Sequence, residues 1–273
     1  KISELEIKIS ETNVVKKEVQ VTLKKEIQKG GVGKTTTVHN LADFLGSKGY
    51  KCLCIDIDAQ ASLTIASGID PREDENIMYM MEDPKKNFIK KKTNYDLIPS
   101  SLSLSEFDMY FTAKLGREKK LKECIAKYKD RYDFILLDCS PTLGLATVNA
   151  LVASDKLLIP QQTEFFSMKG LTLIFETLKN IKDNNLNDDL ELLGIVLTLF
   201  DRRKRLHKDV KELIEENFKD QVFETIIRSN ADLAAAPSHF KPVFAYNPKS
   251  YGAQDYRKLG NELLKRLKKR GSK

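Results

Sequence analysis

The sequence predicts an α/β protein with a mainly parallel central sheet and helices on both faces. Short apolar runs recur along the chain, without the polar alternation of strands that face water on one side. A typical amphipathic helix pattern, formed by Leu171, Ile174, Phe175 and Leu178, lies between two of these runs. Strands that alternate with helices are typical of parallel sheets covered on both sides. The apolar runs are residues 52–57, 97–98, 134–137, 157–159 and 192–200.

The first part of this pattern surrounds a glycine-rich loop. Val19, Val21 and Leu23 alternate along the chain, which predicts a strand that leads into the loop. A helix is expected from Lys34, because apolar residues follow it at the spacing of one helical face, and Gly49 is expected to end it. The apolar residues of that face are Val38, Leu41, Ala42 and Leu45.

One domain accounts for most of the chain. A length of 273 residues is enough to bury a substantial core, and the sequence contains no internal repeat or low-complexity linker. We expect residues 1–18 to form a polar N-terminal extension. Residues 19–273 are then expected to form a single domain that ends in a basic helix.

The composition narrows the classes of function. Lysine and arginine outnumber aspartate and glutamate by 46 to 39, and the formal charge of +7 favours an anionic partner. No apolar run approaches the roughly 18 residues that span a bilayer, so we expect a cytoplasmic protein. The histidines and cysteines lack the spacing of metal ligands, and we expect reduced thiols that pack as small apolar groups. The cysteines are Cys52, Cys54, Cys124 and Cys139.

The strongest motif is the loop at residues 28–36, whose sequence is Gln-Lys-Gly-Gly-Val-Gly-Lys-Thr-Thr. Glycines let the backbone wrap closely around a phosphate, and the helix that follows adds its positive end to the same anion site. In such a loop Lys34 reaches the β- and γ-phosphates, and the Thr35 hydroxyl holds Mg²⁺. Gln28 stands where the common pattern has its first glycine. The predicted nucleotide-binding residues are Lys29, Gly30, Gly31, Val32, Gly33, Lys34, Thr35 and Thr36.

Carboxylates follow two of the apolar strands. Asp56 and Asp58 end the strand at 52–57, and Asp138 ends a strand that resembles a Walker B segment. Parallel sheets present their ligand sites at the carboxyl ends of the strands, so we expect these side chains beside the phosphate loop. A plainer interpretation, in which each aspartate only caps the following turn, remains open.

Lys29, directly before the paired glycines, resembles the signature lysine of the deviant Walker A ATPases, which include ParA, MinD and the nitrogenase iron protein. In that group ATP joins two monomers, and this lysine reaches the partner's phosphates. Residues 56–60 are similar to the group's D-x-D-P-Q segment, with Ala59 in place of proline. The resemblance implies that Lys29, Lys34 and Asp58 are catalytic, and that Thr35, Asp56 and Asp138 support Mg²⁺ directly or through water. Asp58 would position the attacking water.

Further segments resemble the ParA family of DNA-partitioning ATPases, so that the resemblance extends over residues 28–260. They are residues 137–144, 169–171, 236–243 and 251–256. The resemblance implies a weak ATPase whose ATP-bound homodimer binds double-stranded DNA without sequence preference. It also implies a ParB-like centromere-binding partner that stimulates hydrolysis, and a nucleoid-associated location.

Basic residues in the C-terminal half of the chain are candidate DNA contacts. Phosphate contacts of this kind give salt-dependent binding without sequence preference. Around Asn230, where the family often carries arginines, the chain has Ser229 and Asp232. A merely solubilising helix face is the alternative interpretation. The candidates are Arg202, Arg203, Lys204, Arg205, Lys258, Lys265, Arg266 and Lys269.

Three other functions remain open at this point. The basic C-terminal helix would also suit a MinD-like ATPase that lies on anionic lipid, although Leu263, Leu264 and Leu267 offer little apolar area. An iron-sulfur ATPase would need a recognisable cysteine cluster, which the sequence lacks. A binding module with negligible hydrolysis is disfavoured by the presence of Lys29, Lys34, Asp58 and Asp138 together.

Overall fold

The computed structural model describes residues 17–21, 31, 33–142, 144–164 and 167–270. Within them the chain forms a seven-stranded sheet in the order β3-β4-β2-β5-β1-β6-β7, and only β3 runs antiparallel to its neighbour. The mainly parallel sheet predicted from the apolar runs is confirmed. The strands are β1 (Lys17–Val21), β2 (Cys52–Ile57), β3 (Lys90–Lys91), β4 (Asp96–Ile98), β5 (Phe134–Cys139), β6 (Lys156–Gln162) and β7 (Glu191–Thr198).

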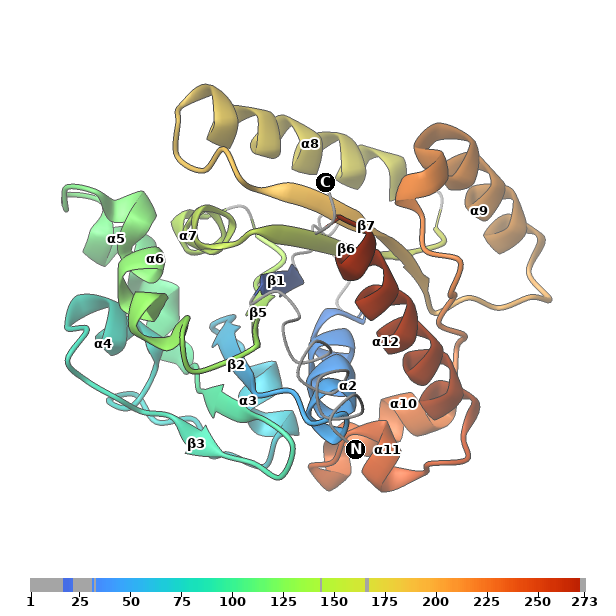
Figure 1. The fold of residues 1–273 in the computed structure, drawn as a ribbon, viewed down its shortest axis with the longest axis horizontal. Helices are drawn as coiled ribbons and strands as arrows, with labels where there is room; N and C mark the ends of the chain where they lie inside the picture. The colour runs from blue at the N-terminus through green and yellow to red at the C-terminus, as the bar shows by residue number, and fades with distance from the viewer. Residues whose placement is uncertain (1–16, 22–30, 32, 143, 165–166, 271–273) are drawn as a thin grey trace, which may run out of the picture.

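Helices cover both faces of this sheet, as the sequence predicts (Figure 1). The helices α2 (Lys34–Ser47), α3 (Ser62–Ala66), α10 (Ala231–Ala235), α11 (Val243–Tyr246) and α12 (Tyr251–Arg270) pack on one face. The other face is covered by α4 (Ile77–Glu82), α5 (Phe107–Phe111), α6 (Lys120–Ile125), α7 (Leu145–Ala153), α8 (Ser167–Asp183) and α9 (Arg205–Phe218). In the part of the chain that the structure describes, every helix is too short or too polar to cross a membrane.

The side chains of the central strands alternate between the two cores. Cys54 and Leu136 pack toward α2 and α12, whereas Ile55 and Leu137 pack toward α4, α6 and α7. All six residues of β2 and of β5 are buried. Such strands need apolar residues at most positions, which explains why they are nearly continuous apolar runs in the sequence. The exceptions are Asp56 and Asp138, near the carboxyl ends of the two strands.

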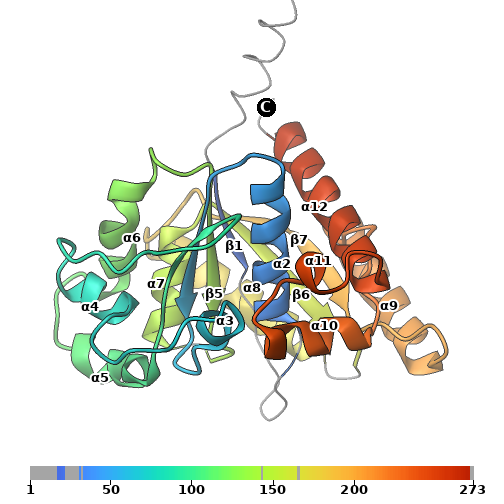
Figure 2. The ribbon, with the colours of Figure 1, turned by 90° about the horizontal axis from the view of Figure 1, so that it is seen from below.

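The long C-terminal helix packs directly along α2 (Figure 2). Tyr256, Leu259, Leu263 and Leu267 of α12 are buried and form the apolar stripe of this helix. Gly260 permits the close approach, because a Cβ atom at this position would lie 2.2 Å from the Phe44 ring of α2. The two helices therefore form a tightly fitted pair.

The charged segment at 70–93, where the sequence has neither an apolar run nor a helical pattern, contains the short helix α4 and the edge strand β3. Asn76 caps α4 by accepting a hydrogen bond of 3.0 Å from the Met78 amide. The lysines of β3 form ion pairs of 2.6 Å with Glu75 and Asp96. Val19 and Val21 of the strand expected before the glycine-rich loop lie in β1, between β5 and β6, with Val21 opposite Asp138. Leu23 lies outside the described residues.

Candidate nucleotide-binding site

The glycine-rich loop meets α2 in a conformation that only glycine adopts without strain. Gly31 has φ 104° and Gly33 has φ 86°, both in the left-handed region. Gly33 is the N-cap of α2, and its carbonyl accepts bonds of 2.8 Å from the Thr37 amide and 2.6 Å from the Thr37 hydroxyl. The first turn of α2 contains no acidic residue. The amide groups of this turn and its positive dipole end therefore favour an anion in front of Lys34, Thr35 and Thr36.

Three of the predicted loop residues lie outside the described part of the chain. They are Lys29, Gly30 and Val32. The role assigned to Lys29 therefore stays a prediction. The other residues of the motif line one cavity of about 480 Å³ at the start of α2, together with Asp58 from the end of β2.

The two strand-end aspartates that precede this cavity lie side by side. In the parallel pairing of β2 with β5, Asp56 is opposite Asp138, and both are fully buried. Asp56 is well satisfied: its Oδ2 accepts bonds from the Thr64 amide (2.9 Å) and hydroxyl (2.8 Å), and its Oδ1 accepts from the Asp58 amide (3.2 Å). Among the described residues, neither carboxylate oxygen of Asp138 has a hydrogen-bond partner of ordinary geometry, although the Thr35 hydroxyl is close enough to lower the pKa of this carboxyl.

Burial makes both carboxyl groups hard to ionise. It raises the pKa of Asp56 from 3.8 to about 7, while the bonds from Thr64 act in the opposite direction. Burial also raises the pKa of Asp138 well above its usual range, and the adjacent Asp56 adds to this effect. The nearby Thr35 hydroxyl and Lys34 ammonium offset the effect only in part.

Asp138 is the side chain that would gain most from a cation. Its unsatisfied oxygens lie beside the first turn of α2, where Thr35 supplies a hydroxyl. A divalent cation bound to nucleotide phosphates would satisfy this carboxylate and favour its ionised form. Among the described residues there is no group of three or more histidine, cysteine, aspartate or glutamate side chains that could hold a metal unaided. The residues present therefore fit a cation that arrives with phosphate.

Asp58 extends from the end of β2 into the cavity. It is half-buried, and its Oδ1 accepts a bond of 3.0 Å from the Gln60 amide. This bond orients the carboxylate near Lys34 and Thr35 at the phosphate end of the cavity. The arrangement allows Asp58 to contact a water molecule at the end of a bound phosphate chain.

Residues far along the chain complete the wall of the cavity. Thr198 and Leu199 come from the end of β7, and Ile227, Asn230 and Leu233 come from the segment before and within α10. The sequence analysis did not identify this part of the site. An apolar wall of this kind, with a few polar groups, is typical of a pocket for a planar ring.

Tyr256 and Thr64 are further residues that sequence reasoning missed. The Tyr256 hydroxyl lies 3.0 Å from the Thr37 hydroxyl, which joins α12 to the helix that follows the phosphate loop. Thr64 holds Asp56 through two bonds. Each contact depends on the folded chain, and no local spacing could have indicated either.

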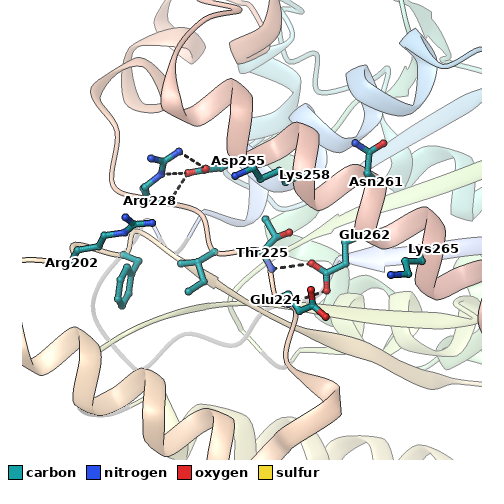
Figure 3. Close-up of a pocket in the computed structure, with 11 residues that line it drawn as sticks. Arg202, Glu224, Thr225, Arg228, Asp255, Lys258, Asn261, Glu262 and Lys265 are labelled. Carbon is teal, nitrogen blue, oxygen red and sulfur yellow. Dashed lines mark hydrogen bonds and ion pairs between the residues drawn. The ribbon is translucent and has the colours of Figure 1, made fainter.

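The predicted basic residues do not form one continuous cluster. Arg202, Lys258 and Lys265 line a groove of about 520 Å³ between the end of β7 and α12 (Figure 3). Arg228, also in this groove, forms a two-bond ion pair of 2.9 Å and 2.6 Å with Asp255.

Other members of the predicted set bind neighbouring groups. Arg203 donates to both carboxylate oxygens of Asp201, which holds the pKa of Asp201 well below its usual range. Arg266 contacts Glu262 at 3.0 Å and donates to two backbone carbonyls. Lys204 and Arg205 lie at the start of α9, and the side chain of Lys269 lies outside the described residues.

Comparison with known proteins gives consistent matches. The AAA_31 family, described as an AAA domain, matches residues 21–192. The chain is 39% identical to the sporulation initiation inhibitor protein Soj of Bacillus subtilis, over 86% of this chain and 95% of Soj. It is 37% identical to the chromosome partitioning protein ParA of Myxococcus xanthus, over 88% and 86% of the two chains.

Solved structures agree with these matches. The fold resembles cobyrinic acid a,c-diamide synthase of Mycobacterium smegmatis with bound ATP analog and magnesium, with a TM-score of 0.78, 28% identity and coverage of 92% and 96%. It also resembles a plasmid partition protein of Borrelia burgdorferi, with a TM-score of 0.69, 26% identity and coverage of 93% and 99%.

Proposed function

Because the chain belongs to the AAA_31 family and is a P-loop ATPase of the ParA/Soj type, we propose that it is an ATP-dependent DNA-partitioning switch. It hydrolyses ATP, with Mg²⁺ as cofactor. The observation that carries the proposal is the pairing of an anion site at the start of α2 with the buried carboxylate of Asp138, which lacks a hydrogen-bond partner of ordinary geometry in the part of the chain that the structure describes.

The residues of the site divide the chemistry between them. The amides at the start of α2 and the Lys34 ammonium bind the β- and γ-phosphates. Thr35 and Asp138 hold the cation, directly or through water, and Asp56 supports Asp138 from the neighbouring strand. When bound, Mg²⁺ neutralises charge that develops on the phosphate oxygens. Asp58 orients the attacking water, and its bond from the Gln60 amide fixes its position.

Lys29 is proposed to act across a dimer. As in the family that the loop resembles, two copies would enclose ATP, and Lys29 of each would reach the partner's phosphates. A cation at this place stabilises the transition state in the manner of an arginine finger. Hydrolysis would then separate the copies, and a ParB-like partner would accelerate it.

The DNA-binding surface is proposed to centre on the groove of Figure 3. Arg202, Lys258 and Lys265 point into the open space there and are available for phosphates. Arg203 and Arg266 are engaged with protein groups, so we expect them to contribute less to DNA affinity. A dimer carries two such surfaces, and the second contact becomes intramolecular, which raises avidity. A location on the nucleoid follows from this activity.

A membrane-bound, MinD-like function is the second candidate. The fold resembles the cell division ATPase MinD of Pyrococcus furiosus, with a TM-score of 0.72 and 24% identity. However, Leu259, Leu263 and Leu267 of α12 are buried against the sheet and α2. Because these side chains are unavailable to lipid, α12 lacks the apolar face that an interfacial helix inserts.

DNA binding across a salt series, with ATP, ADP or no nucleotide, tests the proposal. Binding that needs ATP, weakens with salt and disappears in Lys29→Ala is the expected result. Lys34→Ala should abolish nucleotide binding itself. DNA binding that is equal under all nucleotide conditions would contradict the switch, and ATP-dependent flotation with anionic vesicles would favour the membrane alternative.

A further inference from the structure

A second groove lies at the opposite end of α2 from the phosphate loop. It measures about 590 Å³ and is bounded by the end of α2, the turn between β3 and β4, the segment at 240–245 and Arg257 of α12. A 14-residue helix is about 20 Å long, so the groove and the phosphates lie at opposite ends of that length. We name this feature the α2–α11 groove, after two of the helices that form it.

Aromatic side chains form its walls. The rings of Phe44 and Phe244 lie 6.3 Å apart, and Phe244 is only partly buried. Phe240 is 58% exposed and has φ 56°, in the left-handed region that favours glycine. A bulky residue in this conformation carries a strain on the order of 1 kcal/mol. The Phe240 amide, which donates to the Pro237 carbonyl at 3.0 Å, holds the backbone there at the end of a short helical turn.

Cations surround these rings. Lys48, Lys92, Lys241 and Arg257 all line the groove, and among the described residues none of them forms an ion pair. Lys48 lies 5.7 Å from the centre of the Phe44 ring, and Arg257 lies 5.5 Å from that of Phe244.

One acidic side chain lines the groove and does little to balance this charge. It belongs to Asp43, which is buried and accepts a bond of 2.8 Å from the side-chain Nδ2 of Asn94. Burial raises the pKa of Asp43, so this carboxyl is less readily charged than a free one. The groove is therefore both strongly cationic and partly aromatic.

We propose that the α2–α11 groove is a docking site for an acidic peptide segment of a partner protein that carries an apolar anchor residue. Carboxylates of the segment would pair with Lys48, Lys241 and Arg257, and the anchor would pack on Phe240. An exposed aromatic ring next to cations without ion-pair partners favours binding of such a ligand, because apolar burial and charge pairing occur together.

The groove favours a peptide over nucleic acid. Its cations could pair with the phosphates of a duplex, but these would leave the exposed Phe240 ring without an apolar contact, whereas an apolar side chain of a peptide would supply one. Single-stranded nucleic acid stacks on aromatics and is the strongest competitor, so it becomes one arm of the test.

The groove is also connected to the nucleotide site. Lys241 lines both the groove and the nucleotide cavity. Asn40 of α2 accepts a bond of 2.7 Å from the Val243 amide, which fixes the start of α11 beside the groove. A ligand in the groove would thus contact the segment that closes the nucleotide cavity. The docking proposal itself does not depend on DNA binding or on partitioning.

The test measures binding of a fluorescent synthetic peptide, with glutamates on both sides of a phenylalanine-leucine pair, to the full chain by anisotropy. Phe240→Gly should weaken binding roughly tenfold, and Lys48→Glu and Arg257→Glu several-fold each. Glycine suits the backbone at position 240, so the first variant should melt no lower than the parent. Lys85→Glu, an exposed change of the same charge outside the groove, should alter binding by less than about twofold.

Three results would overturn the proposal. The first is that the peptide fails to bind. The second is that Lys85→Glu weakens peptide binding as much as Lys48→Glu does, which indicates general charge attraction. Alternatively, a single-stranded oligonucleotide binds more tightly than the peptide and loses affinity in Phe240→Gly, which assigns the groove to nucleic acid.

Discussion

Because Asp138 is buried beside Asp56, the free energy of unfolding should depend on pH, and Asp138→Asn should remove this contribution. Asp138 is fully buried beside Asp56, and among the described residues its oxygens have no hydrogen-bond partner of ordinary geometry. Its pKa in the folded protein is well above the usual 3.8, because of burial and the adjacent carboxyl. Asparagine has nearly the same shape and carries no charge.

The sign of the effect follows from proton binding. The unfolded chain releases the Asp138 proton near pH 4, while the folded protein retains it. Stability of the nucleotide-free protein therefore falls as pH rises above 4, by about 1.4 kcal/mol for each pH unit over which the group stays protonated only in the folded state. Between pH 5 and pH 7 the parent should therefore lose stability that Asp138→Asn keeps.

Urea denaturation at pH 5, 6 and 7 without nucleotide or Mg²⁺ measures this difference. His39, whose pKa is lowered to about 4 by burial, makes stability rise with pH in the same range, but it does so in both proteins and cancels from the comparison. The exposed Asp74→Asn is the matched control, and its profile should run parallel to that of the parent. Parallel profiles for Asp138→Asn as well would refute the account of a carboxyl kept neutral by burial.

Three further changes test separate parts of the fold and the surface. Gly260→Ala should destabilise the protein by about 1 to 3 kcal/mol in thermal or urea unfolding, because the new methyl group would meet the buried Phe44 ring. Tyr256→Phe should cost about 1 kcal/mol of unfolding free energy, since the Thr37 hydroxyl keeps its bond to the loop but loses its partner on α12. Lys258→Ala should weaken DNA binding equally for all sequences and reduce the slope of log affinity against log salt by about 1; an unchanged slope would remove this residue from the interface.

Most of the sheet could be predicted because strands buried on both faces leave a strong trace in the sequence. The runs that became β5 and β7 contain apolar residues at almost every position. Helix α4 was missed, because six residues are too few to display a helical period. Its buried face (Ile77, Met78, Met80 and Met81) becomes apparent only when the strands beneath it are in place.

The phosphate loop and the aspartates of the nucleotide site could be predicted from the sequence. The residues that β7 and the start of α10 add to the site could not. Lys34, Asp58 and Asp138 lie in motifs whose spacing is local, and parallel strands bring the ends of β2 and β5 together. Asn230 and Thr198 line the same cavity from segments that no local pattern connects with the loop. Contacts of this kind depend on how α10 and β7 pack, which a single sequence does not display.

The basic surface shows a different limit of prediction from sequence. Arg266 and Lys265 are neighbours of equal charge in the sequence, yet Arg266 is held by Glu262 and backbone carbonyls while Lys265 faces the open groove. Charge patterning identifies cations but not the ones that neighbouring groups engage. The structure therefore argues against Arg266 as a DNA contact on α12 and keeps Lys265 as a candidate.

The packing of α12 constrains how ATP would control DNA binding. The helix is joined to α2 through the Tyr256–Thr37 bond, and to the segment after β7 through bonds from the Glu224 and Thr225 amides to Glu262. Moving Lys258 and Lys265 relative to the nucleotide would break these contacts together. Control through dimer formation requires no such movement, because pairing two copies doubles the cationic surface. We therefore expect ATP-dependent DNA affinity to rise with protein concentration across the dimerisation range, while single copies bind DNA equally weakly with ATP and with ADP. Anisotropy titrations of labelled duplex DNA at several protein concentrations, matched against sedimentation of the same samples, measure this; a monomer that binds DNA more tightly with ATP than with ADP would contradict it.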